Sequence, residues 1–281
     1  MNLWKQVKES WCPTDMVAYQ GGKYRLGSTL AGIINDFMST HGLETYTEPF
    51  FGCGGVTRHI KAPVITVTDN NADLLQLWLE VREGKFERPQ PEQITPLVYA
   101  QHRNNNNQAP NATRAFFGLF CSAAYRYMGS FVHSRDRKPI VEYVDRHFER
   151  FTDEATSWFA KVHVLPAQCY SKLSTRHNQV IYADPPYHQT QGYWDTGEHK
   201  YGRFDAQAFW QVANQWAEDG NYVFVSYNTK PLCQHKKWTA VWTSEYQTQS
   251  ASHTHVRTEY LWFRGPDQVQ GTTESQPMDA E

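Results

Sequence analysis

The chain has 281 residues, with 27 Lys and Arg against 29 Asp and Glu, so its formal charge is −2 at pH 7. This balance excludes a protein that coats nucleic acid through bulk charge, although it leaves room for a local basic face. Ten Trp, 16 Tyr and 15 Phe supply a large apolar core, which excludes disorder over most of the length. Because no apolar run approaches about 18 residues and no signal peptide is recognisable, we expect an intracellular globular protein without a membrane span.

Short apolar segments alternate with amphipathic ones along the chain. The short segments predict strands at residues 45–50, 64–68, 180–183 and 222–227. The amphipathic segments predict helices at residues 71–83, 113–127 and 205–218, and the last apolar segments predict a hairpin from residues 238–246 and 256–263. Strands that alternate with helices indicate an α/β domain with a mostly parallel sheet and a terminal antiparallel addition.

Composition divides the chain into four parts. Residues 100–150 hold eight Lys or Arg against four Asp or Glu, as expected of a module that faces phosphates. Residues 266–281 hold four acids and no base, which predicts a disordered tail. We therefore predict a first part of the main domain at residues 1–88, a mainly helical insert at 89–160, a second part at 161–265, and the tail at 266–281.

The cysteines and histidines predict neither disulfides nor a metal site. Five scattered cysteines without a Cys-x-x-Cys pair argue against a disulfide framework and against a cysteine-rich zinc site. His253 and His255 flank Thr254, but no third ligand lies near them in the sequence. We expect buried thiols and no metal.

A glycine-rich loop follows the first predicted strand. It reads Glu-Pro-Phe-Phe-Gly-Cys-Gly-Gly over residues 48–55, and its glycines permit a tight turn and a close approach to a ligand. Asp69 ends the next strand, 17 residues after Gly52, where an acid can bind ribose hydroxyls. The combination favours a nucleotide-like ligand over a structural turn.

A second motif, Asp184-Pro185-Pro186-Tyr187, follows an apolar strand. The two prolines lack backbone donors, so their carbonyls are available as acceptors, and Asp184 adds a side-chain acceptor. Tyr187 supplies a flat face. Such a cluster suits an amino group on a planar base, whereas the alternative is a proline-rich turn with a capping acid.

A third motif, Tyr19-Gln20-Gly21-Gly22-Lys23, presents an aromatic ring beside a cation. The three motifs in this order resemble those of the Dam-type DNA adenine methyltransferases, and the resemblance spans residue 19 to about residue 230. It implies a Rossmann-like methyltransferase sheet, S-adenosylmethionine as cofactor, and a DNA-reading insert at residues 89–160 between the two parts of a catalytic domain.

The resemblance also implies roles for individual residues. The cofactor would be bound by residues of all three motifs and the intervening acid: Tyr19, Lys23, Glu48, Phe50, Gly52, Cys53, Gly54, Asp69 and Asp184. Lys23 would lie near its carboxylate and Asp69 at its ribose. Catalysis would be carried out by the residues of the second motif: Asp184, Pro185, Pro186 and Tyr187.

Double-stranded DNA is the implied partner, no membrane partner is expected, and the resemblance leaves a cognate restriction endonuclease open. The family's usual target-recognition stretch is absent, so we assign DNA binding to basic residues of the insert: Arg103, Arg126, Arg135, Arg137 and Lys138. A solvated basic face is the alternative for this run.

The resemblance implies methyl transfer to the N6 amine of a flipped-out adenine. Asp184 and the Pro185 carbonyl would accept the amine hydrogens, while Tyr187 would stack on the base. Methylation of the cytosine N4 amine is the nearest alternative. Methylation of RNA or of a protein amide, and a non-catalytic module that binds DNA or cofactor, are others.

Overall fold

A computed structural model describes residues 22–105, 109–123, 126–135, 138–187, 204–249 and 254–266. Its elements in chain order are α1 (Gly27–His41), β1 (Thr45–Glu48), η2 (Thr57–His59), β2 (Val64–Val67), α2 (Ala72–Arg82), η3 (Pro91–Gln93), α3 (Pro96–Asn104), α4 (Ala112–Phe120), β3 (Ser134–Arg135), β4 (Lys138–Pro139), α5 (Ile140–Thr156), η5 (Phe159–Lys161), β5 (His163–Val164), η6 (Tyr170–Lys172), β6 (Val180–Ala183), α6 (Ala206–Glu218), β7 (Tyr222–Tyr227), η7 (His235–Lys237), β8 (Thr239–Gln249) and β9 (Thr254–Arg264).

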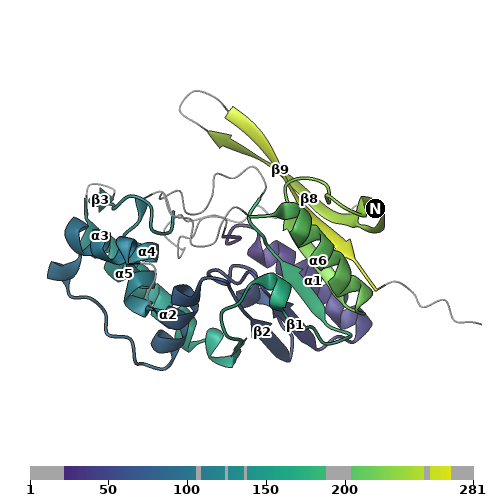
Figure 1. Cartoon of the computed structure of the whole chain (residues 1–281), viewed down its shortest axis with the longest axis horizontal. Coiled ribbons are helices and arrows are strands. Elements are labelled where there is room, and N and C mark those ends of the chain that lie inside the picture. Colours follow the sequence, from purple (N-terminus) through teal and green to yellow (C-terminus); the bar gives the residue numbers. More distant parts are fainter. Residues whose placement is uncertain are drawn as a thin grey trace, which may run out of the picture.

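One sheet of seven strands organises the fold, in the order β5–β2–β1–β6–β7–β9–β8 (Figure 1). The strands from β5 to β7 are parallel, whereas β9 runs antiparallel to both β7 and β8. Parallel neighbours need crossover connections, which the helical segments supply. The predicted α/β class, with a mostly parallel Rossmann-like sheet and a terminal antiparallel hairpin, is confirmed.

The sheet is covered on both faces because side chains alternate along each strand. All four residues of β6 are buried. Val180 and Tyr182 pack in the core under α1, whereas Ile181 and Ala183 pack in the core under α6. A strand buried on both faces explains why this segment is a continuous apolar run.

The helical segment, residues 89–160, gathers at one end of the molecule, next to α2 (Figure 1). Trp78 of α2, Phe116 of α4 and Phe151 of α5 are fully buried in one aromatic core. The Trp78 and Phe151 ring centroids are 4.2 Å apart. The helical segment therefore shares its core with α2, which belongs to the first predicted part of the chain.

The helix predicted at residues 113–127 is wrong in its second half, because α4 ends at Phe120. Beyond it, Ser122 pairs with Phe131 in an antiparallel bridge, and the Ala123 amide donates to the Ser130 carbonyl at 2.7 Å. Met128 has a φ of 54°, a left-handed conformation that interrupts a helix. Local apolar spacing continues through this segment, but tertiary pairing determines its backbone.

The two strands of the terminal hairpin are longer than the other strands of the sheet. The last pair between β7 and β9 joins Tyr227 to Tyr260, and β9 before that point pairs with β8. In Figure 1 the hairpin projects beyond the sheet at the edge where the parallel strands end.

Three further features of the described part of the chain concern its cysteines, its potential metal ligands and its apolar helices. Its four cysteines, Cys53, Cys121, Cys169 and Cys233, are free thiols. No group of three or more His, Cys, Asp or Glu side chains among the described residues is placed to hold a metal ion. No described helix has both the length and the apolar character needed to span a bilayer.

Candidate functional site

The candidate site lies at the carboxyl ends of β1 and β6, which are neighbours in the middle of the sheet. The strand order reverses between them: β2 and β5 lie on the side of β1, whereas β7 lies on the side of β6. Open α/β sheets bind ligands outside the carboxyl ends of their strands at such a reversal of strand order. The two main motifs, residues 48–55 and 184–187, lie at these two strand ends.

The loop after β1 turns the Gly52 backbone amide toward Asp69. Oδ2 of Asp69 accepts a hydrogen bond from the Gly52 amide at 2.8 Å, and Oδ1 accepts one from the Asn71 amide at 2.8 Å. Burial raises the pKa of Asp69, and the hydrogen bonds from Asn71, Gly52 and Asn70 oppose that rise. Since a carboxylate offers about four lone-pair sites, Asp69 keeps capacity for further donors such as hydroxyl groups.

Glycine is required at close contacts around this loop. Gly54 has a φ of 67°, and a Cβ there would lie 2.5 Å from the Trp158 ring. A Cβ on Gly27, at the start of α1, would lie 2.0 Å from the Gly55 carbonyl oxygen. The loop is therefore packed directly against α1 and Trp158, with no space for a side chain at either position.

Lys23 and Asp184 form a buried ion pair across the site. Lys23 Nζ lies 2.6 Å from Asp184 Oδ1, and the two side chains are 9% and 15% exposed. Burial lowers the pKa of Lys23, but the charges of Asp184 and Glu259 outweigh it and leave that pKa raised. Burial raises the pKa of Asp184 to about 6, although the Lys23 charge opposes the rise. At neutral pH, Asp184 is therefore mainly a carboxylate, and within the described residues its Oδ2 accepts no hydrogen bond.

Glu259 of β9 completes this cluster, and the motif analysis did not find it. Its side chain is 2% exposed and its Oε1 lies 3.6 Å from Lys23 Nζ. The Tyr187 hydroxyl donates a hydrogen bond to the same oxygen. A signal does exist in the sequence, because strand alternation places Glu259 on the same face as Leu261, which is buried under α1.

Two residues of the glycine-rich motif direct their side chains inward. The Glu48 carboxylate accepts hydrogen bonds from Tyr46 and Thr57 at the end of β1. Burial raises the pKa of Glu48 to about 8, against the lowering effect of these two hydrogen bonds. The Cys53 thiol is buried in the aromatic core, and burial raises its pKa well above the usual range. In both residues, the backbone is the part left to face a ligand.

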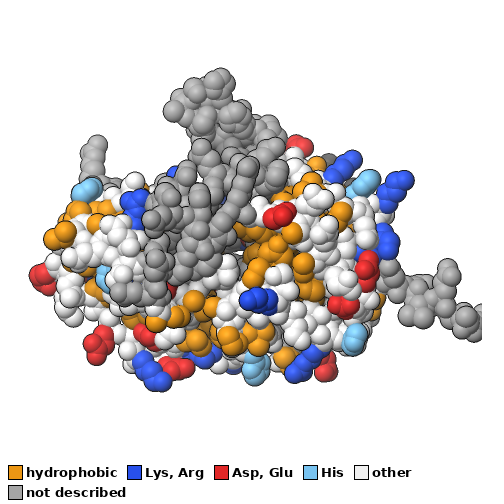
Figure 2. Space-filling model, viewed as in Figure 1, with side chains coloured by type: hydrophobic (Ala, Val, Ile, Leu, Met, Phe, Trp, Pro, Cys, Tyr) orange, Lys and Arg blue, Asp and Glu red, His pale blue; other side chains and the backbone are white. Residues whose placement is uncertain are grey.

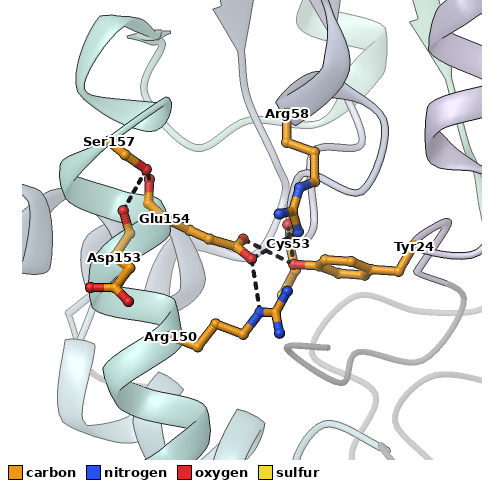
Figure 3. A network of polar contacts seen from close by, with 7 residues as sticks. All are labelled: Tyr24, Cys53, Arg58, Arg150, Asp153, Glu154 and Ser157. Carbon is orange, nitrogen blue, oxygen red and sulfur yellow. Dashed lines mark hydrogen bonds and ion pairs between the residues drawn. The ribbon is translucent and has the colours of Figure 1, made fainter. Parts of the chain in front are cut away.

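A second polar network connects α5 with this loop (Figure 3). Glu154 is buried and accepts from Arg58 at 2.8 Å and from the Tyr24 hydroxyl at 3.2 Å. The Tyr24 hydroxyl is shared with the Cys53 carbonyl at 3.0 Å, and Arg150 Nε lies 3.5 Å from Glu154. Because Tyr24 follows Lys23 directly, this network joins the helical segment to the ion pair of the site. Sequence reasoning missed it.

Of the remaining residues predicted for the site, the structure describes all except Tyr19. Phe50 follows β1 with its ring stacked on Tyr170, at a centroid distance of 5.3 Å. Pro185 and Pro186 lie beside Asp184, and Pro185 is buried. Tyr19 lies outside the described residues.

The predicted DNA-binding residues are placed in part. Arg103 lies in the last turn of α3, and Arg126 lies in the turn after α4, both half-buried. Arg135 of β3 pairs with Lys138 of β4 through the backbone, but their side chains and all of Arg137 lie outside the described residues. Figure 2 shows one face of the molecule, on which basic and acidic side chains are interspersed.

The donors and acceptors of the site suit a ligand with several polar groups. The Lys23–Asp184 pair can receive the charged groups of an amino acid, and Asp69 can receive hydroxyl groups. The side-chain nitrogen of Asn71, whose backbone amide donates to Asp69, is buried and has no hydrogen-bond partner among the described residues. Such an unpaired buried donor is costly unless a ligand or water satisfies it.

Residues 19–258 match the family described as D12 class N6 adenine-specific DNA methyltransferase. No curated protein matches the sequence. Two solved structures are similar to 87% and 86% of this chain, at 8% and 13% identity and TM-scores of 0.40 and 0.34. The first is PH1948 from Pyrococcus horikoshii, a candidate RNA methyltransferase, matched over 87% of its length. The second is SMU.472, a candidate methyltransferase complexed with SAH, matched over 53% of its length.

Proposed function

Because the chain belongs to the D12 class of N6 adenine-specific DNA methyltransferases, we propose that it methylates the N6 amine of an adenine flipped out of double-stranded DNA. Membership implies S-adenosylmethionine as the methyl donor. The observation that carries the proposal is the buried Lys23–Asp184 pair at the reversal of strand order, with one carboxylate oxygen left for a substrate hydrogen.

The residues around the pair fit S-adenosylmethionine. Lys23 binds its carboxylate as a point charge, and Asp69 accepts from its ribose hydroxyls. The unpaired Asn71 side-chain nitrogen is a further donor beside Asp69. The backbone of residues 48–54 lines the pocket, and Tyr19 contributes the contact that the motif implies. When bound, the cofactor supplies an electrophilic methyl group on a sulfonium centre.

Asp184 and Pro185 orient the target amine. The adenine amine is a weak nucleophile, because its lone pair is delocalised into the ring. Asp184 Oδ2 and the Pro185 carbonyl accept its two hydrogens, which favours a more tetrahedral nitrogen directed at the methyl group. Positioning and preorganised electrostatics then supply most of the catalysis.

Tyr187 and the helical segment act on the DNA. The amine is inaccessible inside a duplex, so the base is extruded and stacks on Tyr187. Basic residues of the segment, including Arg103 and Arg126, bind the phosphates on either side. The division into a catalytic domain and a DNA-binding insert at residues 89–160 is part of this proposal.

The test is to incubate the purified protein with S-adenosylmethionine and unmodified double-stranded DNA, and to sequence single molecules of the product. We expect N6-methyladenine within one fixed sequence context. A product modified at the cytosine N4 amine, transfer to RNA alone, or cofactor binding with no transfer to DNA would each overturn the proposal.

A further inference from the structure

We propose that Glu259 is a positioning residue for methyl transfer, which fixes the ring of Tyr187 in the orientation that receives the target base. This inference rests on the proposed function, because the base acts as a substrate only if the chain methylates DNA. It concerns a residue of the terminal hairpin, outside all the motifs of the sequence.

The hairpin carries Glu259 into the site. Glu259 pairs with Ser244 of β8, directly beyond the last pair between β7 and β9 at Tyr227 and Tyr260. Its side chain is buried at 2% exposure, on the face of β9 that packs under α1. Lys23 lies just before α1, so the register of the hairpin brings Glu259 and Lys23 together.

Contacts with Glu259, Tyr227 and Lys23 restrain the Tyr187 ring. Its hydroxyl donates to Glu259 Oε1, and its ring packs edge-on against Tyr227 at 5.1 Å between centroids and an angle of 68°. Lys23 Nζ lies 5.1 Å from the ring centroid and 3.6 Å from Glu259 Oε1. One carboxylate oxygen therefore connects the hydroxyl of the ring to the cation beside it, which fixes both the position and the tilt of the ring.

A carboxylate is a costly residue for packing alone. A buried acid pays a desolvation penalty, and an apolar side chain of similar size often stabilises a fold as well as an ion pair does. A charged acceptor gives a short, directional hydrogen bond to the hydroxyl. Rigid placement of a stacking ring matters because small displacements of a bound substrate lower the rate strongly.

The charge on Glu259 also affects Asp184, which supplies an independent readout. The groups that face Asp184 are Lys23, Glu259, Glu48 and Tyr182. Glu259 raises the pKa of Asp184, whereas Lys23 lowers it. Transfer requires ionised Asp184, so the rate falls at low pH. Removal of the Glu259 charge should therefore move the acidic limb of the rate profile to lower pH, an effect that loss of packing alone would not produce.

The experiment compares Glu259→Gln, Tyr187→Phe and the double variant with the wild-type protein. Single-turnover transfer is measured at saturating S-adenosylmethionine, on a matched duplex and on one with the target adenine opposite an abasic position. Glu245→Gln is the matched control, because it removes the same charge from an exposed position one residue along the hairpin. Denaturant unfolding establishes that every variant is folded.

We expect Glu259→Gln and Tyr187→Phe each to lower the rate about tenfold, as for the removal of one charge-assisted hydrogen bond. The double variant should be little slower than either single variant, because both remove the same contact. The effect should shrink on the abasic duplex, where extrusion is easier. Glu245→Gln should match the wild type.

A Glu259→Gln rate equal to that of the wild type would overturn the inference. Multiplying effects in the double variant, an equal effect on both duplexes, or an acidic limb that stays in place would also overturn it. If the wild-type protein itself transfers no methyl group to DNA, the proposed function fails and takes this inference with it.

Discussion

Two buried ion pairs, one in the helical end of the molecule and one at the carboxyl ends of the parallel strands, differ in how many of their polar atoms are hydrogen-bonded within the protein. Arg114 of α4 makes two hydrogen bonds of 2.5 Å to the two oxygens of Asp73 in α2. Arg114 also donates to the carbonyls of Asn105 and Ala109, and Asp73 also accepts from the Asn111 amide. Every strong group of this pair is matched within the protein.

In the Lys23–Asp184 pair, Lys23 Nζ contacts Oδ1 of Asp184 at 2.6 Å and also faces Glu259, whereas Oδ2 of Asp184 accepts nothing from the described residues. It lies at the ends of parallel strands, whereas the Arg114–Asp73 pair lies between two helices. Burial alone therefore does not mark a functional charge. The Arg114–Asp73 pair holds two helices together, whereas Asp184, at a strand end, keeps one oxygen that we propose to receive the substrate.

Asp73→Ala should give the largest effect on stability. It leaves the Arg114 guanidinium buried without its counter-ion, and breaking a buried pair in this way costs about 3–5 kcal/mol. Denaturant unfolding followed by circular dichroism measures this decrease in stability. The transfer rate of the folded fraction should stay close to that of the wild type.

Glu83→Gln is the matched control for this change, because Glu83 ends the same helix and its ion pair with Lys85 is exposed. We expect no measurable change in the free energy of unfolding. Equal destabilisation by Asp73→Ala and Glu83→Gln would show that saturation of the buried pair has no structural importance.

Asp184→Ala should give the opposite result, a lower rate with the fold retained, because Glu259 still faces Lys23 when Asp184 is removed. Removal of one preorganised acceptor commonly lowers a rate about 10²–10³-fold. Single-turnover transfer at saturating cofactor measures this, with DNA affinity and unfolding as controls for the fold. Near-normal transfer would mean that the motif is only a structural turn, and that the two pairs do not differ in function.

The sequence predicted the parts of this comparison that depend on local patterns. The bounds of β6 and β7 agree with the prediction, because apolar runs end there at polar residues. Asn71 and Asp205 cap α2 and α6, positions at which asparagine and aspartate are common. The glycine-rich loop, Asp69 and Asp184 were located from spacing and from resemblance.

Pairings over long separations in the sequence were not predictable. Lys23 and Asp184 are 161 residues apart, so their ion pair depends on the order of the strands. Glu154 is one of five acids in α5 and Glu259 is the one acid in β9, and acids in helices and strands usually face solvent. Only the packing of α5 and the register of the hairpin bury them.

The third prediction concerns the basic residues of the helical segment that we propose to bind DNA. Arg135, Arg137 and Lys138 lie on or between β3 and β4, which pair through Arg135 and Lys138. Changing all three to Gln should weaken DNA binding and reduce the slope of log affinity against log salt by about 0.9 for each phosphate that these side chains neutralise. Titration at several salt concentrations measures the slope.

The matched control changes Lys230, Lys236 and Lys237 to Gln. These three exposed lysines carry the same total charge as the basic triplet, and they lie outside the helical segment. Their removal should leave the slope unchanged. Equal slopes for the two triple variants would mean that the basic run is a solvated face, and the helical end would then contribute only structure to the comparison.

Glu48 combines features of both pairs, because it is buried and accepts two side-chain hydrogen bonds, as Asp73 does from Arg114, and lies at a strand end like Asp184. Burial raises its pKa from about 4.5 to about 8, so the folded protein keeps this proton to higher pH than the unfolded chain does. Its contribution to stability is therefore fully present below about pH 4.5 and is lost as the pH rises through about 8, by about 1.4 kcal/mol for each pKa unit over which the two states differ. Glu48→Gln removes this titration. The free energy of unfolding of the wild type minus that of Glu48→Gln, measured in urea from about pH 5 to about pH 8, should fall steadily as the pH rises. A constant difference would show that the carboxyl group is ionised throughout, and that the end of β1 holds a charge of the same kind as the end of β6.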